Sequence, residues 1–204
     1  GQILESGQVF RFQKLSDSSY LLNAKQKIIK IVQQEGSSSL LIHNTSIGEL
    51  DEIWSSYFDI DTDYSGITKV LAQKDDVMAK AVAFGEGIRI LKQDPWEMLI
   101  SFIISQNKAI PHIKQCISNL CRIFGEKLGD IEPYGAYYSF PSPECLASAT
   151  EEALRNCKVG FRAPYILDAA RRITEGKVDL DELYSLSADE AKEKLMTIKG
   201  VGPK

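Results

Sequence analysis

The sequence predicts an α+β protein, in which a β-rich module with flanking helices precedes an all-helical module. Short aliphatic and aromatic runs fill roughly the first 60 residues, as is typical of antiparallel strands. Beyond them, apolar residues recur at helical spacing. Hydrophobic residues make up 44% and charged residues 25% of the chain, which is typical of a folded globular protein. We place the boundary between residues 1–93 and 94–204.

The first module is predicted to contain an antiparallel sheet. Its four runs rich in aliphatic or aromatic residues are Val9–Phe12, Tyr20–Leu22, Lys27–Val32 and Leu40–His43. Residues 33–39, with a glycine and three serines, predict a hairpin loop before the fourth run. Residues 47–57 have helical spacing, the polar residues 59–66 predict a loop, and residues 75–84 predict a short helix.

The second module is predicted to be helical throughout. Asp94 is an expected N-cap, because Pro95 and Glu97 follow at the first and third helical positions. The helix after it is apolar on nearly all sides, which indicates a core helix. An amphipathic helix is expected over residues 110–124. Further helices are expected from Ser142, over residues 163–173, and from the capping box that starts at Ser187.

Composition restricts the classes of function. The net charge of −4 argues against an extensive basic surface, yet local backbone N–H groups could still bind phosphate. The cysteines, at positions 116, 121, 145 and 157, form no CxxC pair, and neither histidine has a ligand partner near it in the sequence. We therefore expect reduced, buried cysteines and no required cofactor. Every apolar run falls short of the roughly 18–20 residues that span a bilayer, so no membrane partner is expected.

The motif that carries chemistry lies at the end of the chain. The helix capped by Ser187 is followed by Gly200-Val201-Gly202, then by Pro203 and Lys204. This pattern predicts the first helix and the hairpin of a helix-hairpin-helix motif, in which glycines let the backbone approach a phosphate. The motif alone favours a non-enzymatic DNA-binding protein in which Lys204 contacts phosphate.

Four further segments carry a family resemblance. In order along the chain they are Ser6–Phe12, Tyr57–Tyr64, Gln93–Pro95 with Leu99–Asn107, and Gly160–Ala163. Together with the hairpin they resemble the 8-oxoguanine DNA glycosylase/AP lyases of the helix-hairpin-helix DNA glycosylase superfamily. The resemblance implies a TBP-like domain over residues 1–93 and a helix-hairpin-helix domain over 94–204, incomplete at its C-terminus. It implies base-excision repair of double-stranded DNA that contains 8-oxoguanine, by a monomer.

The resemblance also implies a role for Lys204 and for Gly7. Lys204 matches the lysine whose amine attacks C1′ of the sugar, displaces the damaged base and forms a Schiff base, before β-elimination cleaves the strand. Gly7 matches the glycine whose main-chain carbonyl recognises the lesion. That carbonyl accepts the hydrogen that 8-oxoguanine carries at N7 and repels the N7 acceptor of guanine. The alternative for Gly7 is a simple turn before the strand.

Four residues match positions that contact the base left unpaired when the lesion leaves the duplex. Asn107 and Arg162 match contacts to the estranged cytosine, and Phe161 matches the wedge beside them. The family pattern has arginine where this chain has His112, and tyrosine where it has Phe161. We therefore hypothesise a weakened preference for cytosine opposite the lesion. Alternatives are a core aromatic for Phe161 and a helix C-cap for Asn107.

The remaining expectations concern ions, completeness and location. In this fold the carbonyls of Met196, Ile198 and Val201 would face a structural Na, K or Ca ion.

The family's catalytic aspartate is expected roughly 20 residues after Lys204. No carboxylate within the chain replaces it, since Asp94 is an N-cap and Asp168 a helix-face charge. Residues 1–204 alone are therefore expected to bind DNA poorly and catalyse nothing. The location would be cytoplasm or nucleoid in a prokaryote, and the nucleus in a eukaryote.

A glycosylase of the same fold for another damaged base is the remaining alternative. Alkylated-base enzymes commonly lack the lysine, so Lys204 argues against them. Adenine-type and endonuclease III-type enzymes carry an iron–sulfur cluster after the hairpin domain. The β-rich first module favours the 8-oxoguanine type.

Overall fold

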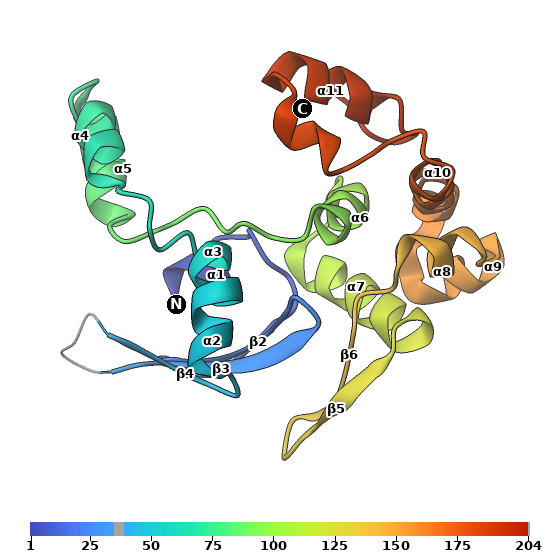
Figure 1. Ribbon diagram of the computed structural model, residues 1–204, viewed down its shortest axis with the longest axis horizontal. Coiled ribbons are helices and arrows are strands. Elements are labelled where there is room, and N and C mark those ends of the chain that lie inside the picture. Colours follow the sequence, from blue (N-terminus) through green and yellow to red (C-terminus); the bar gives the residue numbers. More distant parts are fainter. Residues whose placement is uncertain (35–38, 204) are drawn as a thin grey trace. The chain divides into compact units, whose positions relative to one another are not determined.

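The computed structural model describes residues 1–34 and 39–203 and divides the chain into two compact units, residues 1–93 and 94–204 (Figure 1). The first unit contains a four-stranded antiparallel sheet in the order β1-β2-β3-β4. The second is mainly helical. The predicted α+β class, with the sheet first, is confirmed.

The strands of the first unit follow one another around tight turns. They are β1 (Phe12–Ser16), β2 (Ser19–Ala24), β3 (Lys27–Gln33) and β4 (Leu40–His43). Lys25 and Gln26, both with positive φ, form the two-residue turn between β2 and β3. The first predicted strand was placed too early, since pairing with β2 starts only at Arg11 and Phe12. The predicted loop over 33–39 falls largely on residues 35–38, outside the described residues.

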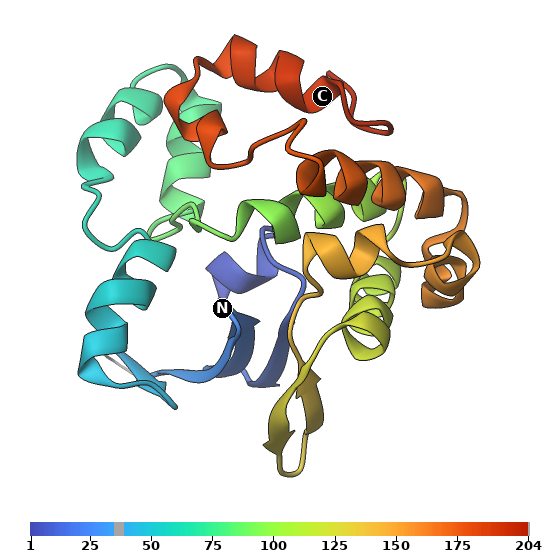
Figure 2. The same cartoon turned by 45° about the vertical axis from the view of Figure 1, so that its right-hand side comes forward.

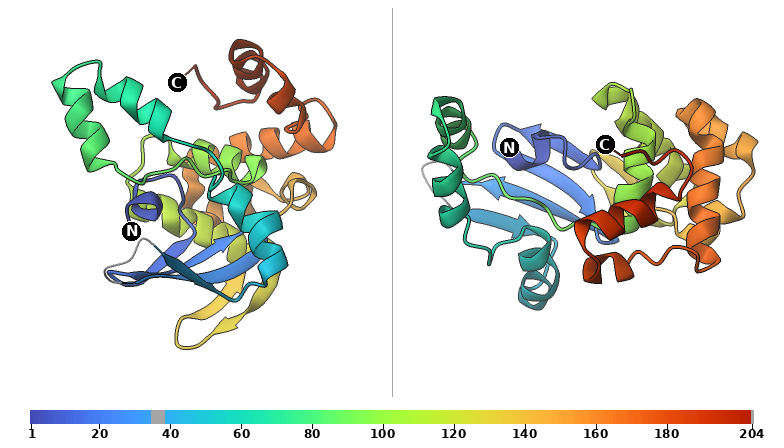
Figure 3. Two further views of the ribbon diagram at one scale, coloured as in Figure 1. Left: turned by 60° about the vertical axis from the view of Figure 1, so that its left-hand side comes forward. Right: turned by 90° about the horizontal axis from the view of Figure 1, so that it is seen from above.

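Helices cover one face of this sheet. The N-terminal helix α1 (Gln2–Glu5) and a helical segment made of α2 (Ile47–Glu49), the π-helical turn η1 (Leu50–Trp54) and α3 (Ser55–Tyr57) pack on the sheet (Figures 1 and 3). Trp54 is fully buried in the shared core with Leu22 and Ile29. The expected helix over residues 47–57 is confirmed, with the π turn inside it.

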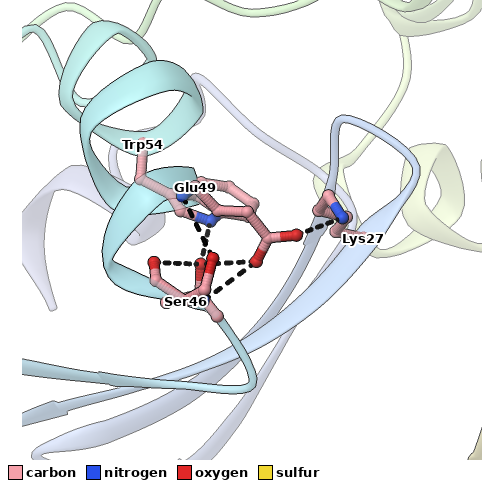
Figure 4. Close-up of polar contacts among 5 residues, drawn as sticks. Lys27, Ser46, Glu49 and Trp54 are labelled. Carbon is pink, nitrogen blue, oxygen red and sulfur yellow. Dashed lines mark hydrogen bonds and ion pairs between the residues drawn. The ribbon is translucent and has the colours of Figure 1, made fainter.

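A polar cluster closes the start of this helical segment (Figure 4). The carboxylate of Glu49 accepts hydrogen bonds from Lys27 Nζ at 2.6 Å, from the Ser46 N–H at 3.0 Å and from Thr45 Oγ1 at 3.1 Å. Trp54 Nε1 in turn donates to Thr45 Oγ1 at 2.9 Å. The cluster therefore joins β3, the helix N-terminus and the buried tryptophan.

Two further helices complete the first unit, α4 (Ser65–Ala72) and α5 (Asp76–Phe84). The predicted helix over residues 75–84 is confirmed, with Asp75 accepting from the Met78 N–H as its N-cap. The loop predicted over 59–66 ends at Tyr64, because α4 begins at Ser65. Asp63 binds both the N–H and the hydroxyl of Ser65 there.

The second unit is built around α6 (Pro95–Ser105), whose N-cap Asp94 accepts from the Glu97 N–H (Figure 2). The helices α7 (Ile110–Phe124) and α10 (Ala163–Thr174) pack against it. The short helices α8 (Pro143–Ala147) and α9 (Glu151–Leu154) pack against α10, and the turns η2 (Arg155–Val159) and η3 (Gly160–Arg162) lead from α9 to α10. The turn η4 (Glu182–Ser185) and helix α11 (Ala188–Met196) follow. Ile100, Ile104 and Ile166 are among its fully buried side chains. The expected caps at Asp94, Ser142 and Ser187 are confirmed.

One element of the second unit departs from the all-helical expectation. Strands β5 (Lys127–Ile131) and β6 (Gly135–Tyr138) form a two-stranded antiparallel hairpin after α7. Each is only four or five residues long, and neither sequence alternates apolar and polar residues, as a half-buried strand usually does. That is why the sequence did not predict them.

Within the described residues, no helix is both long and apolar enough to cross a membrane. The four cysteines are free, and Cys116, Cys121 and Cys157 are buried, as expected. Cys145, also expected to be buried, is only partly so. No group of three or more histidine, cysteine or acidic side chains in the described part of the chain could hold a metal ion.

Candidate DNA-binding and catalytic site

The hairpin after α11 depends on a glycine. Gly200 has φ +85°, and a Cβ atom there would lie 2.7 Å from Cδ2 of the Tyr165 ring. Ile198 is buried beneath this turn, and its carbonyl accepts the Val201 N–H at 3.1 Å. Gly202, by contrast, has no described heavy atom within 4 Å of such a Cβ position. The two glycines therefore differ: Gly200 is required by the fold, whereas Gly202 leaves open space beside the backbone.

Two side chains from distant helices hold this hairpin. Asp168 on α10 accepts the Lys199 N–H at 2.9 Å and pairs with Arg172 Nε at 2.8 Å. Its side chain is only 18% exposed, so the expectation of a plain helix-face charge was wrong. Gln106, which follows α6, donates from Nε2 to the Gly200 carbonyl. Sequence alone could not indicate either contact, because the partners are 31 and 94 residues apart.

The candidate cation ligands run from Met196, the last residue of α11, to Val201 in the hairpin. Neutral carbonyl oxygens suit the hard cations that were expected there. One lone pair of the Ile198 carbonyl oxygen accepts the Val201 N–H, and the second lone pair is available to an ion. The main-chain carbonyls of Met196, Ile198 and Val201 are therefore suitable ligands for such a cation. The bound ion itself stays a prediction.

Asn107 lies between α6 and α7, and His112 lies in the first turn of α7. Asn107 is exposed and left-handed, with φ +53°, directly after the C-cap residue Gln106. Its conformation fits the residue that follows a helix end, and its exposed amide remains open to a ligand. His112 is also exposed, and its Nε2 lies 3.3 Å from Lys108 Nζ. Lys108 also donates to the Lys158 carbonyl at 3.1 Å, a cationic neighbour that sequence reasoning missed.

Phe161 and Arg162 adopt opposite environments. Phe161 is 64% exposed, so the core-aromatic alternative for it is wrong. Arg162 is only 5% exposed, and its guanidinium carbon lies 4.4 Å from the Phe161 ring centroid. It donates from Nη2 to the Gln106 carbonyl, and its Nε has no hydrogen-bond partner among the described residues. The guanidinium thus lies beneath an exposed aromatic ring rather than free at the surface.

Within the second unit, these contacts join three of the expected site residues, Arg162, Asn107 and Gly200. Arg162 binds the Gln106 carbonyl, Gln106 binds the Gly200 carbonyl, and Asn107 is the next residue along the chain. Gly7 belongs to the first unit, where it is exposed and has φ +89°. No described heavy atom would meet a Cβ atom at Gly7 within 4 Å, so only its backbone conformation demands glycine. Lys204 lies outside the described residues.

Two family models and several known proteins match the chain. Residues 1–99 match the family described as 8-oxoguanine DNA glycosylase, N-terminal domain, and residues 100–201 match the HhH-GPD superfamily base excision DNA repair protein. An N-glycosylase/DNA lyase of Saccharomyces cerevisiae is 34% identical over 229 residues, which cover 99% of this chain and 59% of that protein. The curated relative from Arabidopsis thaliana, N-glycosylase/DNA lyase OGG1, is 28% identical, over 98% of this chain and 56% of that protein.

Solved structures agree with the sequence comparisons. The 8-oxoguanine glycosylase/lyase of Clostridium acetobutylicum, in complex with double-stranded DNA containing cytosine opposite 8-oxoG, has a TM-score of 0.91 and 41% identity to this chain. The likeness covers 99% of this chain and 68% of that one. The present chain spans less than two thirds of the length of the relatives from Saccharomyces cerevisiae and Arabidopsis thaliana. By fold, sequence and coverage, the chain belongs to the 8-oxoguanine DNA glycosylase family of the HhH-GPD superfamily.

Proposed function

We propose that the protein containing this chain removes 8-oxoguanine from double-stranded DNA and cleaves the strand at the resulting site. One observation carries the proposal: the hairpin that directly precedes Lys204 is tied through Gln106 to Arg162, beside the exposed Phe161 and Asn107. The candidate phosphate-binding turn that precedes Lys204 in the sequence and the candidate contacts to the opposite strand thus come from one connected region. The Clostridium relative crystallised with 8-oxoG DNA supports the same substrate.

In the proposed reaction the target nucleotide leaves the duplex, and Lys204 attacks it. The Lys204 amine forms a bond to C1′ as the bond from C1′ to the base breaks, and the base leaves with that electron pair and gains a proton. The amine then gives a proton to O4′ as the C1′–O4′ bond breaks, so that the sugar ring opens and a Schiff base forms between the amine and C1′. Removal of a proton from C2′ expels the 3′ phosphate and cleaves the strand.

Residues around the lysine have supporting roles in the proposal. The N–H groups at Gly200, Val201 and Gly202 bind one backbone phosphate without sequence preference. The Gly7 carbonyl recognises the N7 hydrogen of 8-oxoguanine. The exposed Phe161 ring enters the duplex and uncovers Arg162 beneath it, and Asn107, Arg162 and His112 then meet the estranged base. A cation on the hairpin carbonyls would bridge to phosphate and have no catalytic part.

Borohydride trapping with the full-length protein tests the proposal. An 8-oxoguanine duplex should give a covalent adduct that Lys204→Gln abolishes and that Lys199→Gln, the matched control in the same hairpin, retains. DNA binding without an adduct would instead indicate a non-enzymatic helix-hairpin-helix protein. An adduct with another damaged base but not with 8-oxoguanine would indicate a different substrate for the same fold.

A further inference from the structure

The segment that contains Gly7 is anchored on both sides of the glycine. On one side, Ser6 Oγ donates to the Ile3 carbonyl at 2.7 Å, at the end of α1. On the other, the Gln93 side chain donates from Nε2 to the main-chain carbonyl of Gln8 at 2.7 Å. Gly7 itself is exposed and borders open space. A conformationally free residue therefore lies between two fixed ones.

The Gln8 side chain forms a second anchor. Its Oε1 accepts the Leu91 N–H at 2.9 Å, and its Nε2 donates to the Arg89 carbonyl at 3.0 Å. Both ends of one amide are thus bound to main-chain groups of residues 89–91. This arrangement fixes the register between the Gly7 segment and residues 89–93, as a strand pair would.

Residues 89–93 are themselves firmly held in the first unit. Arg89 Nη1 donates to the carbonyls of Asp59 and Thr62, the latter at 2.9 Å. The Lys92 N–H donates to the Tyr57 carbonyl at 2.9 Å, and Leu91 is buried in the core. The anchors at Gln8 and Gln93 therefore connect the Gly7 segment to a rigid support.

We propose that Gln93 and Gln8 are positioning residues that fix the direction of the Gly7 carbonyl and so set the discrimination between 8-oxoguanine and guanine. This inference rests on the proposed role of Gly7. Glycine has the widest range of φ and ψ, so its carbonyl would turn readily without neighbours that hold it. The carbonyl can accept the N7 hydrogen of 8-oxoguanine and repel the N7 lone pair of guanine only when it points at N7, because hydrogen bonds weaken steeply with misalignment.

The test separates base recognition from strand cleavage. In the full-length protein, Gln93→Met keeps the side-chain length and removes the N–H donor. We expect the ratio of excision rates for 8-oxoguanine over guanine to fall about three- to tenfold, the range for one lost hydrogen bond. Cleavage of a preformed abasic site involves no base, so its rate should stay unchanged. Gln8→Met, which breaks the second anchor, should behave in the same way.

Gln2→Met is the matched control. Gln2 Nε2 also donates to a main-chain carbonyl of the first unit, that of Phe84 at 3.1 Å, on the far end of α1 from Gly7. The ratio of excision rates for 8-oxoguanine over guanine in Gln2→Met should equal that of the wild type. Thermal denaturation verifies that each variant is folded. An unchanged ratio in folded Gln93→Met and Gln8→Met, or an equal loss of abasic-site cleavage, overturns the inference. Absence of 8-oxoguanine excision by the wild type would instead contradict the proposed function.

Discussion

At the scale of single residues, the two hairpin glycines have separable tasks. A methyl group at Gly200 would collide with the Tyr165 ring and would sit on a backbone with φ +85°. We expect Gly200→Ala to lower the free energy of unfolding by about 1–3 kcal/mol. Gly202→Ala should leave that free energy unchanged, because its Cβ enters open space, and should weaken DNA binding by obstructing the phosphate.

Thermal denaturation and DNA titration of the two variants measure these effects. Equal stability of Gly200→Ala and Gly202→Ala would contradict the assignment. The comparison also tests why the motif contains two glycines: one meets a need of the fold, and the other leaves room for a ligand.

A second residue-scale prediction concerns His112. It is exposed near Asn107 at the start of α7, where the family pattern has an arginine. A guanidinium presents more donors to a base edge than an imidazole does. His112→Arg should therefore raise the excision rate opposite cytosine, relative to the other three bases, by about tenfold. Excision assays with all four opposite bases measure this, and a strong cytosine bias already present in the wild type would contradict it.

At the scale of elements, Asp168 connects α10 to the hairpin that follows α11. Asp168→Ala leaves the Lys199 N–H and the Arg172 guanidinium without this partner. Hydrogen bonds to charged groups contribute about 1.5–3 kcal/mol, so the hairpin should lose its fixed position and DNA affinity should fall about tenfold or more. DNA titration at fixed salt measures the loss.

Glu175→Gln provides the control on the same helix. Glu175 lies at the C-cap of α10 and pairs with Lys177 at the surface, where an ion pair contributes little. This variant should bind DNA as the wild type does. Similar losses of DNA affinity in Asp168→Ala and Glu175→Gln would show that the charge of α10, rather than the contact with the Lys199 N–H, governs binding.

At the scale of the whole molecule, acid should act unequally on the two units. The Lys27 ammonium, with the Ser46 N–H and the Thr45 hydroxyl, lowers the pKa of Glu49 from 4.5 to about 2. The Lys92 ammonium, with the Tyr64 and Thr62 hydroxyls, lowers the pKa of Asp59 from 3.8 to about 2. In the second unit, hydrogen bonds lower the pKa values of Glu144, Glu175 and Glu190 by less.

A carboxylate whose pKa is lower in the folded state stabilises that state above its unfolded pKa. That stabilisation is lost as the pH falls toward the folded value. Acid should therefore destabilise the first unit between about pH 4.5 and pH 2 more than the second.

The two tryptophans of the chain can report this difference. Trp54 belongs to the first unit and donates to Thr45, a partner of Glu49, whereas Trp96 belongs to the second and donates to the Pro141 carbonyl. In urea denaturation followed by fluorescence, the midpoint of Trp96→Phe, which retains Trp54, should fall more steeply with acid than that of Trp54→Phe. Adding Glu49→Gln to Trp96→Phe should make its urea midpoint depend less steeply on pH. Identical slopes of midpoint against pH for Trp96→Phe and Trp54→Phe would contradict the prediction.

Much of the fold was predictable from the sequence because its signals are local. N-caps at Asp94 and Ser187 bind N–H groups three residues away, and the apolar spacing of α7 and α10 lies within single helices. The hairpin β5–β6 and the true start of β1 were not predictable in this way. Short strands are stabilised by partners elsewhere in the chain, so their own residues carry little signal.

The sequence by itself determined the order of the modules, the Gly-Val-Gly hairpin before Lys204 and the family to which these segments belong. Only the tertiary structure decided that Phe161 is exposed while Arg162 beside it is buried, and that Asp168 and Gln106 hold the hairpin. It alone placed Gln93 on the carbonyl next to Gly7, across 85 residues of chain. The physical reason is that a glutamine or aspartate side chain has the same local preferences whether it meets water or a distant carbonyl or N–H group. Its partner is chosen only when packing of the apolar core brings two remote segments together.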